Sequence, residues 1–259
     1  MTIIQKTLLS IPLIPLGVMM VLFAVAFSAI GLLIVRRFIP RQVLKAHNDV
    51  TAAIFKAITT AYTVLLAFVV VISWQNFDET RKQAATEANC LVSLYRNSAA
   101  FGQPFENDVR SLIKEYVDVV INEEWKTLGR GEESLKARDI LRNVWGLYTS
   151  YEPKTDKEKI FLSESVRKLD NLREMRRLRI IDSRTGVHPI LWFVLVVGAI
   201  INVSFALFFA LDKFVNHVLM VSILGTIIAL ILLTILSFDF PFTGTVHIGP
   251  EAFQQIIGF

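Results

Sequence analysis

The chain has 259 residues, of which 53% are apolar and 19% are charged. Its 27 lysines and arginines only slightly outnumber its 23 acidic residues, and residues 78–187 carry 20 basic against 19 acidic side chains. This nearly neutral segment lacks the basic face that nucleic-acid binding requires, so we expect no nucleic-acid partner. The single cysteine, Cys90, excludes an internal disulfide bond.

Four long stretches without any charged side chain indicate a membrane protein. They run from Thr7 to Val35, from Ala57 to Phe77, from Pro189 to Leu211 and from Phe214 to Phe238. Each reaches the ~20 residues that a helix needs to cross ~30 Å of hydrocarbon. Because lipid offers the backbone no hydrogen-bond partners, we expect each stretch to be helical.

Residues 1–77 are predicted to form the first transmembrane pair, with the first helix over residues 15–35. A basic loop, residues 36–56, joins the two spans. It contains Arg36, Arg37, Arg41, Lys45 and Lys56 against a single acid, Asp49. The run His47-Asn48-Asp49 precedes the second span, and we assign it a structural role in which Asn48 or Asp49 caps that helix.

Residues 78–187 are predicted to form a helical soluble domain. The second span continues without a helix breaker to Phe101, and apolar residues then recur at helical spacing up to Met175. Thr155 and Glu158 match a capping box at the start of the last of these helices. No segment shows the alternation that is typical of a strand.

Residues 188–240 are predicted to form a second transmembrane hairpin, and residues 241–259 a C-terminal tail. The hairpin turns tightly at Asp212-Lys213, and Gly198 and Gly225 are small enough to let helices pack closely. The predicted fold is therefore an all-α membrane protein with four transmembrane helices and a helical soluble domain between the second and third.

The sequence shows none of the common catalytic patterns. It has no Gly-rich phosphate loop, no His-Glu-x-x-His, no cysteine pair with zinc spacing and no Gly-x-Ser-x-Gly. His47 and His188 fall on opposite sides of the membrane in this topology, which argues against a joint metal site. We therefore predict no enzyme, no catalytic residue, no cofactor and no metal site.

The second span carries a stripe that changes from polar to apolar. Its members recur at three- or four-residue spacing: Lys56, Thr59, Thr63, Leu66 and Val70. In a pore-lining helix, Lys56 attracts anions to a mouth, and Leu66 and Val70 form a dry constriction. The same stripe also suits ordinary helix packing, with Lys56 extending to the membrane interface.

Five short motifs are spread over nearly the whole chain. They are His47-Asn48-Asp49, residues 62–68 (YTVLLAF), Leu178-Arg179-Ile180, residues 240–244 (FPFTG) and residues 250–253 (PEAF). In order and spacing, these motifs resemble a family of bacterial membrane proteins described as bestrophin-like. The sequence shows no acidic cluster similar to the calcium clasp of bestrophins.

A more distant resemblance to bestrophins implies a homo-oligomeric anion channel whose pore is lined by the second span. It also implies a cytoplasmic helical domain. The positive-inside rule applied to the loop 36–56 favours the opposite orientation, but arginines near the domain ends balance that loop. Following the resemblance, we expect the soluble domain and both termini on the cytoplasmic side of the bacterial inner membrane.

The predicted function is a homo-oligomeric ion channel that conducts chloride-like anions and is surrounded by membrane lipid. A ring of subunits is needed, because one four-span subunit does not readily enclose a pore. The alternative function is a non-conducting membrane scaffold or sensor whose helical domain binds a protein partner.

Overall fold

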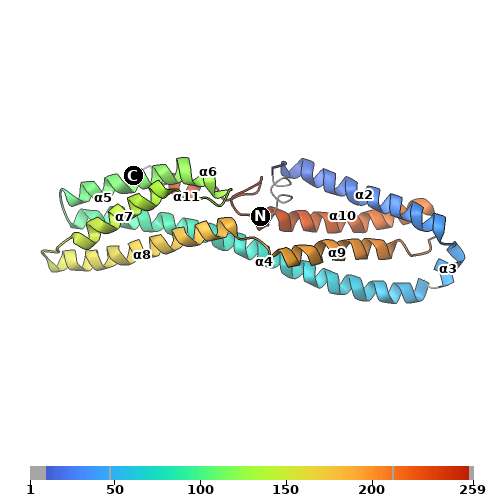
Figure 1. The fold of residues 1–259 in the computed structure, drawn as a ribbon. Coiled ribbons are helices and arrows are strands. Elements are labelled where there is room, and N and C mark those ends of the chain that lie inside the picture. The colour runs from blue at the N-terminus through green and yellow to red at the C-terminus, as the bar shows by residue number, and fades with distance from the viewer. Residues whose placement is uncertain (1–9, 47, 212, 257–259) are drawn as a thin grey trace. The chain divides into compact units, whose positions relative to one another are not determined.

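The computed structural model describes residues 10–46, 48–211 and 213–256, and every regular element within these ranges is helical (Figure 1). The elements are α2 (Leu13–Phe38), α3 (Arg41–Ala46), α4 (Asn48–Asn97), a 3-10 turn (Ser98–Ala100), α5 (Phe105–Val119), a π-helix (Val120–Glu124), α6 (Trp125–Leu128), α7 (Leu135–Ser150), α8 (Asp156–Arg184), α9 (Pro189–Ala206), α10 (Phe214–Asp239) and α11 (Glu251–Gln254). The predicted all-α fold is confirmed.

The chain divides into two compact units. The membrane unit comprises residues 10–75, Gly186–Asp239 and Gly244–Val246. The helical unit comprises Asn76–Thr185, Phe240–Thr243 and residues 247–256. Helix α4 belongs to both units, and two segments of the C-terminal tail belong to the helical unit.

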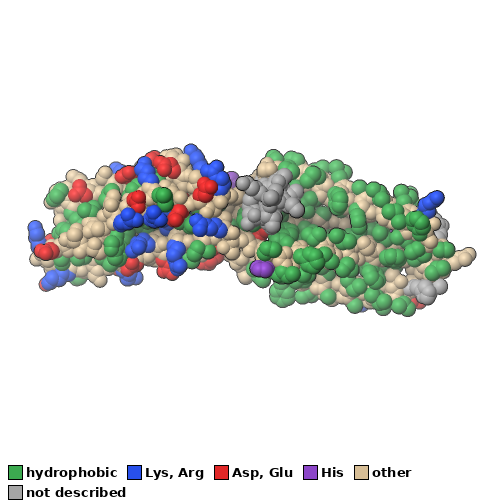
Figure 2. Space-filling view, in the orientation of Figure 1, with side chains coloured by type: hydrophobic (Ala, Val, Ile, Leu, Met, Phe, Trp, Pro, Cys, Tyr) green, Lys and Arg blue, Asp and Glu red, His purple; other side chains and the backbone are tan. Residues whose placement is uncertain are grey.

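The membrane unit exposes large apolar side chains along its helices. Helices α2, α4, α9 and α10 are long and apolar enough to cross a membrane. On them Ile14, Phe23 and Val215 are 80%, 72% and 74% exposed, and the visible surface of this unit is largely apolar (Figure 2). A soluble protein rarely exposes so continuous an apolar surface, so we assign this surface to lipid.

Glycines let the spans of the membrane unit pack closely. A Cβ added at Gly198 of α9 would lie 2.5 Å from the Tyr62 ring, and one at Gly225 of α10 would lie 3.3 Å from Ala24 of α2. The first distance is a collision, because carbon atoms in van der Waals contact lie ~3.5–4.0 Å apart. The absence of a side chain at Gly198 therefore allows α4 and α9 to meet.

The connection between α9 and α10 is longer than the tight turn predicted at Asp212-Lys213, since α9 ends at Ala206 and α10 begins at Phe214. Asp212 itself lies outside the described residues. The Asn48 side chain bonds this connection twice: Oδ1 accepts from the Ala210 amide at 3.0 Å, and Nδ2 donates to the Ala210 carbonyl at 3.4 Å. A side chain thus satisfies backbone groups that a longer α9 would have satisfied itself.

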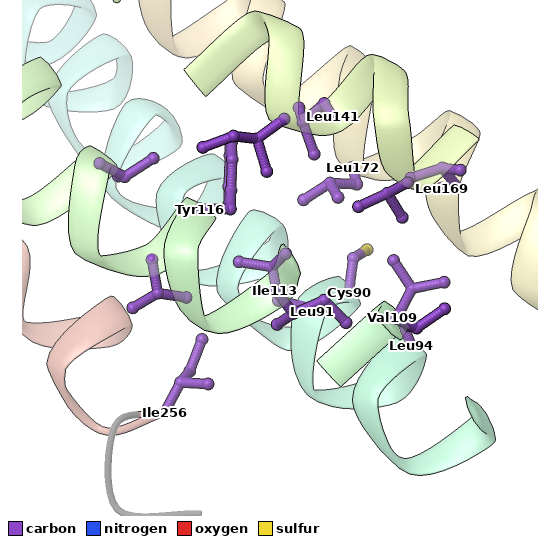
Figure 3. Close-up of a cluster of buried hydrophobic side chains, with 14 of the residues drawn as sticks. Cys90, Leu91, Leu94, Val109, Ile113, Tyr116, Leu141, Leu169, Leu172 and Ile256 are labelled. Atoms are coloured by element: carbon purple, nitrogen blue, oxygen red, sulfur yellow. The ribbon is translucent and has the colours of Figure 1, made fainter. Parts of the chain in front are cut away.

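The helical unit has a conventional apolar core between the second half of α4 and helices α5, α7 and α8 (Figure 3). Leu91, Leu94, Ile113, Leu169 and Leu172 are all less than 2% exposed. Ile256 from the tail also belongs to this core. The C-terminal segment is therefore an integral part of the unit.

Helix α8 begins at the predicted cap. The Thr155 hydroxyl accepts a hydrogen bond from the Glu158 amide at 3.1 Å, as expected. The Glu158 carboxylate accepts from the Lys154 amide at 2.7 Å and from the Tyr151 hydroxyl at 3.0 Å. In a capping box it would accept from the Thr155 amide, so here it reaches one residue further back.

Candidate functional site

The inner face of α4 packs within the membrane unit. Tyr62, Leu66 and Val69 are 7%, 3% and 4% exposed, and they share a core cluster with Leu195 and Val203 of α9. The Tyr62 hydroxyl donates to the Leu195 carbonyl at 2.8 Å. That hydrogen bond matters because nothing in lipid would otherwise satisfy a buried hydroxyl.

A second polar contact between α4 and α9 lies about one helical turn away. The Thr59 hydroxyl donates to Asn202 Oδ1 at 2.8 Å, and Asn202 Nδ2 donates to the Gly198 carbonyl at 2.8 Å. Asn202 is completely buried, and both ends of its amide group are satisfied. These neutral hydrogen bonds fix the rotation of α4 about its axis relative to α9.

The five predicted pore-lining residues fall on different sides of α4. Thr59 bonds α9, Leu66 is buried in the core of the protomer, and Val70 is half-buried against the same core. Lys56 and Thr63 are exposed. The pore-lining role of all five stays a prediction, and the structure separates two open residues from three that face α9 and the core.

Of the three residues predicted to have a structural role at the start of α4, two are described. Asn48 bonds the α9–α10 connection, the Asp49 side chain is exposed, and His47 lies outside the described residues. Their capping role also stays a prediction. The contact with Ala210 gives Asn48 a different structural role. The local sequence does not reveal this role, because the two residues are far apart in the chain.

The opposite face of α4 is open along the whole span. Exposed residues cover a broad face of the helix, and one row of them has alternating spacings of four and three: Ala57, Ala61, Val64, Phe68, Val71 and Gln75. Val64, Phe68 and Val71 are 50%, 64% and 50% exposed. A repeat averaging 3.5 residues keeps one face of a helix directed at a common axis, as in coiled coils. We call these six residues the open face of α4.

A cluster of buried charges lies in the helical unit. The Arg179 guanidinium donates to Glu87 at 2.7 and 3.0 Å and to Glu124 at 2.8 Å, and all three side chains are completely buried. The Tyr116 hydroxyl donates to Glu87 at 2.7 Å, and Arg176 donates to Glu124. Two arginines thus face two carboxylates, and the cluster is neutral overall.

The π-helix between α5 and α6 carries one member of this cluster. Glu124 is the last residue of the π-helix, and it is completely buried. Insertions of this kind shift the facing of the residues that follow and recur at functional sites. The sequence predicts an uninterrupted helix here, because no breaker marks the insertion.

The charge cluster also ties the C-terminal tail to α8. The Arg179 guanidinium lies 4.8 Å from the centre of the Trp125 ring and 5.7 Å from that of Phe253. The Trp125 indole donates to the Ile248 carbonyl at 3.0 Å, and its ring contacts Phe242. Three of the five sequence motifs, around residues 179, 242 and 253, therefore meet at Trp125.

Burial and charge set the protonation of the cluster. Burial alone would raise the pKa of Glu124, but the guanidinium groups of Arg179 and Arg176 outweigh it and hold that pKa below its ordinary value. Burial raises the pKa of Tyr116 well above its ordinary value. Tyr116 therefore stays a neutral donor, and Glu124 stays ionised, at physiological pH.

Two polar side chains of α10, one near each end of the helix, form hydrogen bonds. Asp239 of α10 accepts from the Trp192 indole at 2.9 Å and from the Val187 amide, and His217 pairs with the Ala206 carbonyl at 3.0 Å. Among the residues that the structure describes, no group of three or more histidines, cysteines or acids is placed to hold a metal ion.

Four apolar helices, with the second running on into a helical unit, define a four-span helical membrane protein. A model of the bestrophin-like domain matches residues 22–253, so the chain belongs to the bestrophin-like family. A comparison with curated proteins gives no match.

Solved structures share the fold over nearly the whole chain. A variant of the bacterial bestrophin homologue from Klebsiella pneumoniae is 17% identical with a TM-score of 0.70, covering 93% of this chain and 96% of that one. The structure of that homologue phased with zinc is 16% identical with a TM-score of 0.68, covering 93% and 95%. A variant structure described only as a membrane protein is 18% identical with a TM-score of 0.71, covering 93% and 95%. At such identities the likeness establishes the fold.

Proposed function

We propose that the protein is a homo-oligomeric anion channel whose pore is lined by the open face of α4. The single observation that carries this proposal is the continuous 3.5-residue repeat of exposed residues on that face, small or apolar from Ala57 to Val71 and ending in Gln75. Membership of the bestrophin-like family supports the class of protein.

A path between copies is favoured over a path through one copy. Inside the protomer, Leu66, Leu195 and Val203 belong to a packed apolar core, which leaves no continuous polar route between the described helices. The open face instead presents the same six residues from every subunit to a shared axis. Copies of α4 around that axis would enclose the pore.

The charges on α4 favour anions. From Thr51 to Phe77 the only charged residue is Lys56, which is exposed. An anion within the span therefore meets one positive charge and no carboxylate, and the nearest acid, the exposed Asp49, lies about two turns before Lys56. Of the stripe predicted from the sequence, Lys56 and Thr63 are exposed and flank the open face without belonging to it.

The proposed constriction is a ring of Val64 and Phe68. Phe68 is the largest side chain of the open face, and no polar residue of that face lies within one turn of it. Apolar rings of this kind gate by excluding water. Leu66 and Val70 would then have a packing role, because they hold α4 against neighbouring helices of the same protomer.

A chloride-flux assay in liposomes tests the constriction. We expect wild-type protein to pass chloride and Phe68→Ala to raise the flux about tenfold, the effect of lowering a barrier by ~1.4 kcal/mol. The matched control is Phe193→Ala on α9, which removes a phenylalanine of similar exposure, 63% against 64%, from a different span. An intact oligomer that passes neither anions nor cations would refute the channel and leave the scaffold or sensor function.

We also propose that the helical unit and both termini are cytoplasmic. A fluorescent reporter at the C-terminus should be active and an alkaline phosphatase reporter at the same position inactive, because phosphatase folds only outside the cytoplasm. The reverse pattern would overturn the orientation without affecting the pore proposal.

A further inference from the structure

A basic groove lies between α7 and α8 of the helical unit. It has a volume of about 630 Å³, within the range of 300–1,000 Å³ that is typical of small-molecule sites. Six arginines line it: Arg138, Arg142, Arg173, Arg176, Arg177 and Arg184. Glu133 and Glu174 also line it. Arg138, Arg142 and Arg176 have acidic partners in Glu133, Asp139 and Glu124, which leaves Arg173, Arg177 and Arg184 without an ion pair among the described residues.

Three of these arginines have no acidic partner among the described residues, and two of the three are held in place by neutral groups. The Arg173 guanidinium lies 5.0 Å from the centre of the Trp145 ring, which orients it but leaves its charge uncompensated. The Arg184 Nε donates to the Gly131 carbonyl at 2.7 Å, a neutral partner. Arg177 makes no hydrogen bond or ion pair with any described residue.

Arg176 connects the groove to the buried charge cluster. Its side chain is only 8% exposed, and it donates to Glu124 and to the Ser134 carbonyl. Its buried Nε has no acceptor among the described residues. A buried donor without a partner is unfavourable, so an acceptor supplied from the groove would stabilise it.

The floor of the groove is apolar. Leu141 and Ile180 line it and are 5% and 7% exposed. Guanidinium groups above an apolar surface suit a ligand that has both a multiply charged anionic group and an apolar part. Guanidinium groups match phosphate geometry with two parallel hydrogen bonds, which makes phosphate the preferred partner over a single halide ion.

We propose that this groove binds a phosphate-bearing ligand. The phosphate can come from a soluble phosphorylated compound or from a phospholipid headgroup, since Arg184 is the last residue of α8 and precedes the span α9 closely in sequence. Both sources offer the same chemistry to the arginines. The site is independent of the proposed pore, because the six residues of the open face belong to the membrane unit.

Calorimetric titration of full-length protein in phosphatidylcholine nanodiscs tests the site. The probes are sodium pyrophosphate and short-chain phosphatidylglycerol, with short-chain phosphatidylcholine as the zwitterionic comparison of zero net charge. Arg173→Gln and Arg177→Gln should each weaken binding about tenfold or more, the loss of one charge-assisted hydrogen bond. Arg167→Gln is the matched control, because Arg167 lies on the same helix, is exposed and does not line the groove.

The outcomes separate the two sources and include refutation. A soluble ligand is supported if pyrophosphate binds, Arg177→Gln weakens that binding and Arg167→Gln leaves it unchanged. Binding of phosphatidylglycerol alone, with the same variant pattern, supports a headgroup site. The proposal fails if neither probe binds, or if the control loses as much affinity as the groove variants. It also fails if the groove variants change only the oligomeric state, which would make the groove a subunit interface.

Discussion

The two units of the molecule bury polar groups by different means. In the membrane unit, Thr59 bonds Asn202, and Tyr62 bonds a backbone carbonyl, so these contacts between α4 and α9 are neutral. In the helical unit, Arg179 is fully buried between two carboxylates. The difference shows that close packing and neutral hydrogen bonds hold spans together where water provides no driving force, whereas the water-soluble unit includes charges within a larger apolar core.

The two units are also expected to respond differently to substitutions. A buried ion pair is weak evidence for net stabilisation, because desolvation offsets the attraction between the charges. Removing one partner is costly, however, since the other charge stays buried. We therefore expect the helical unit to respond sharply to loss of a charge and the membrane unit to respond sharply to added volume.

The largest effect is expected for Arg179→Met. The change leaves Glu87 and Glu124 buried without their shared partner, and we expect it to lower the free energy of unfolding of the helical unit by about 3–5 kcal/mol. Hydrogen exchange resolved by mass spectrometry can follow the two units separately. Protection should fall in α5, α7 and α8 and be retained in α10.

Arg167→Met is the control for that experiment. Arg167 pairs with Glu164 on the surface of α8, where its side chain is 72% exposed. We expect a change below about 1 kcal/mol, as for other exposed pairs. Equal losses of unfolding free energy in the two variants would mean that burial of Arg179 does not make its ion pairs more important than the exposed pair.

A smaller effect is expected at alkaline pH. Burial raises the pKa of Tyr148 from 10.0 to about 12, so the unfolded chain releases this proton first. The resulting stabilisation is complete below pH 10 and is lost as the pH rises towards 12, by at most about 3 kcal/mol. Tyr148→Phe should therefore flatten the decline of the unfolding midpoint between pH 10 and 12. Parallel declines in the two proteins would contradict this assignment.

The smallest effect is expected for a pair of glycine substitutions with opposite signs. Gly198→Ala forces a Cβ against the Tyr62 ring and should destabilise the membrane unit by about 1–3 kcal/mol. Gly146→Ala in α7 meets no atom within 4 Å and should stabilise the helical unit by about 0.5–1 kcal/mol. Thermal unfolding in detergent compares the two variants. A stabilising Gly198→Ala would show that α4 and α9 do not approach as closely as described.

The sequence predicts the four spans well because a charge-free stretch of about 20 residues is typical of a membrane-spanning helix and rare in a soluble domain. The Thr155 cap is equally local, since its donor lies three residues away. The sequence does not reveal which face of α4 packs inward. Leu66 and Phe68 are both apolar, and a lipid-facing or pore-facing residue resembles a packed one when there is no water to select polar side chains.

The sequence does not predict the buried charge cluster, because its members are distant in the chain and each resembles a solvent-exposed charged residue. One feature of the sequence does indicate it. The apolar stripe of α8, continued from Leu172 at helical spacing, passes through Arg176 and Arg179, and Glu87 lies on the apolar face of α4 beside Ala84 and Leu91. Charges on a face that otherwise points inward predict a partner, although the partner can be identified only from the fold.

The contact of Trp125 with the C-terminal tail has a consequence for biosynthesis. Phe253 is completely buried in the helical unit, yet it is synthesised after both α9 and α10. Domains usually fold in the order in which they leave the ribosome. Here the core formed by residues 76–185 stays incomplete until the last span has been synthesised, so the helical unit cannot close as soon as its own helices have left the ribosome.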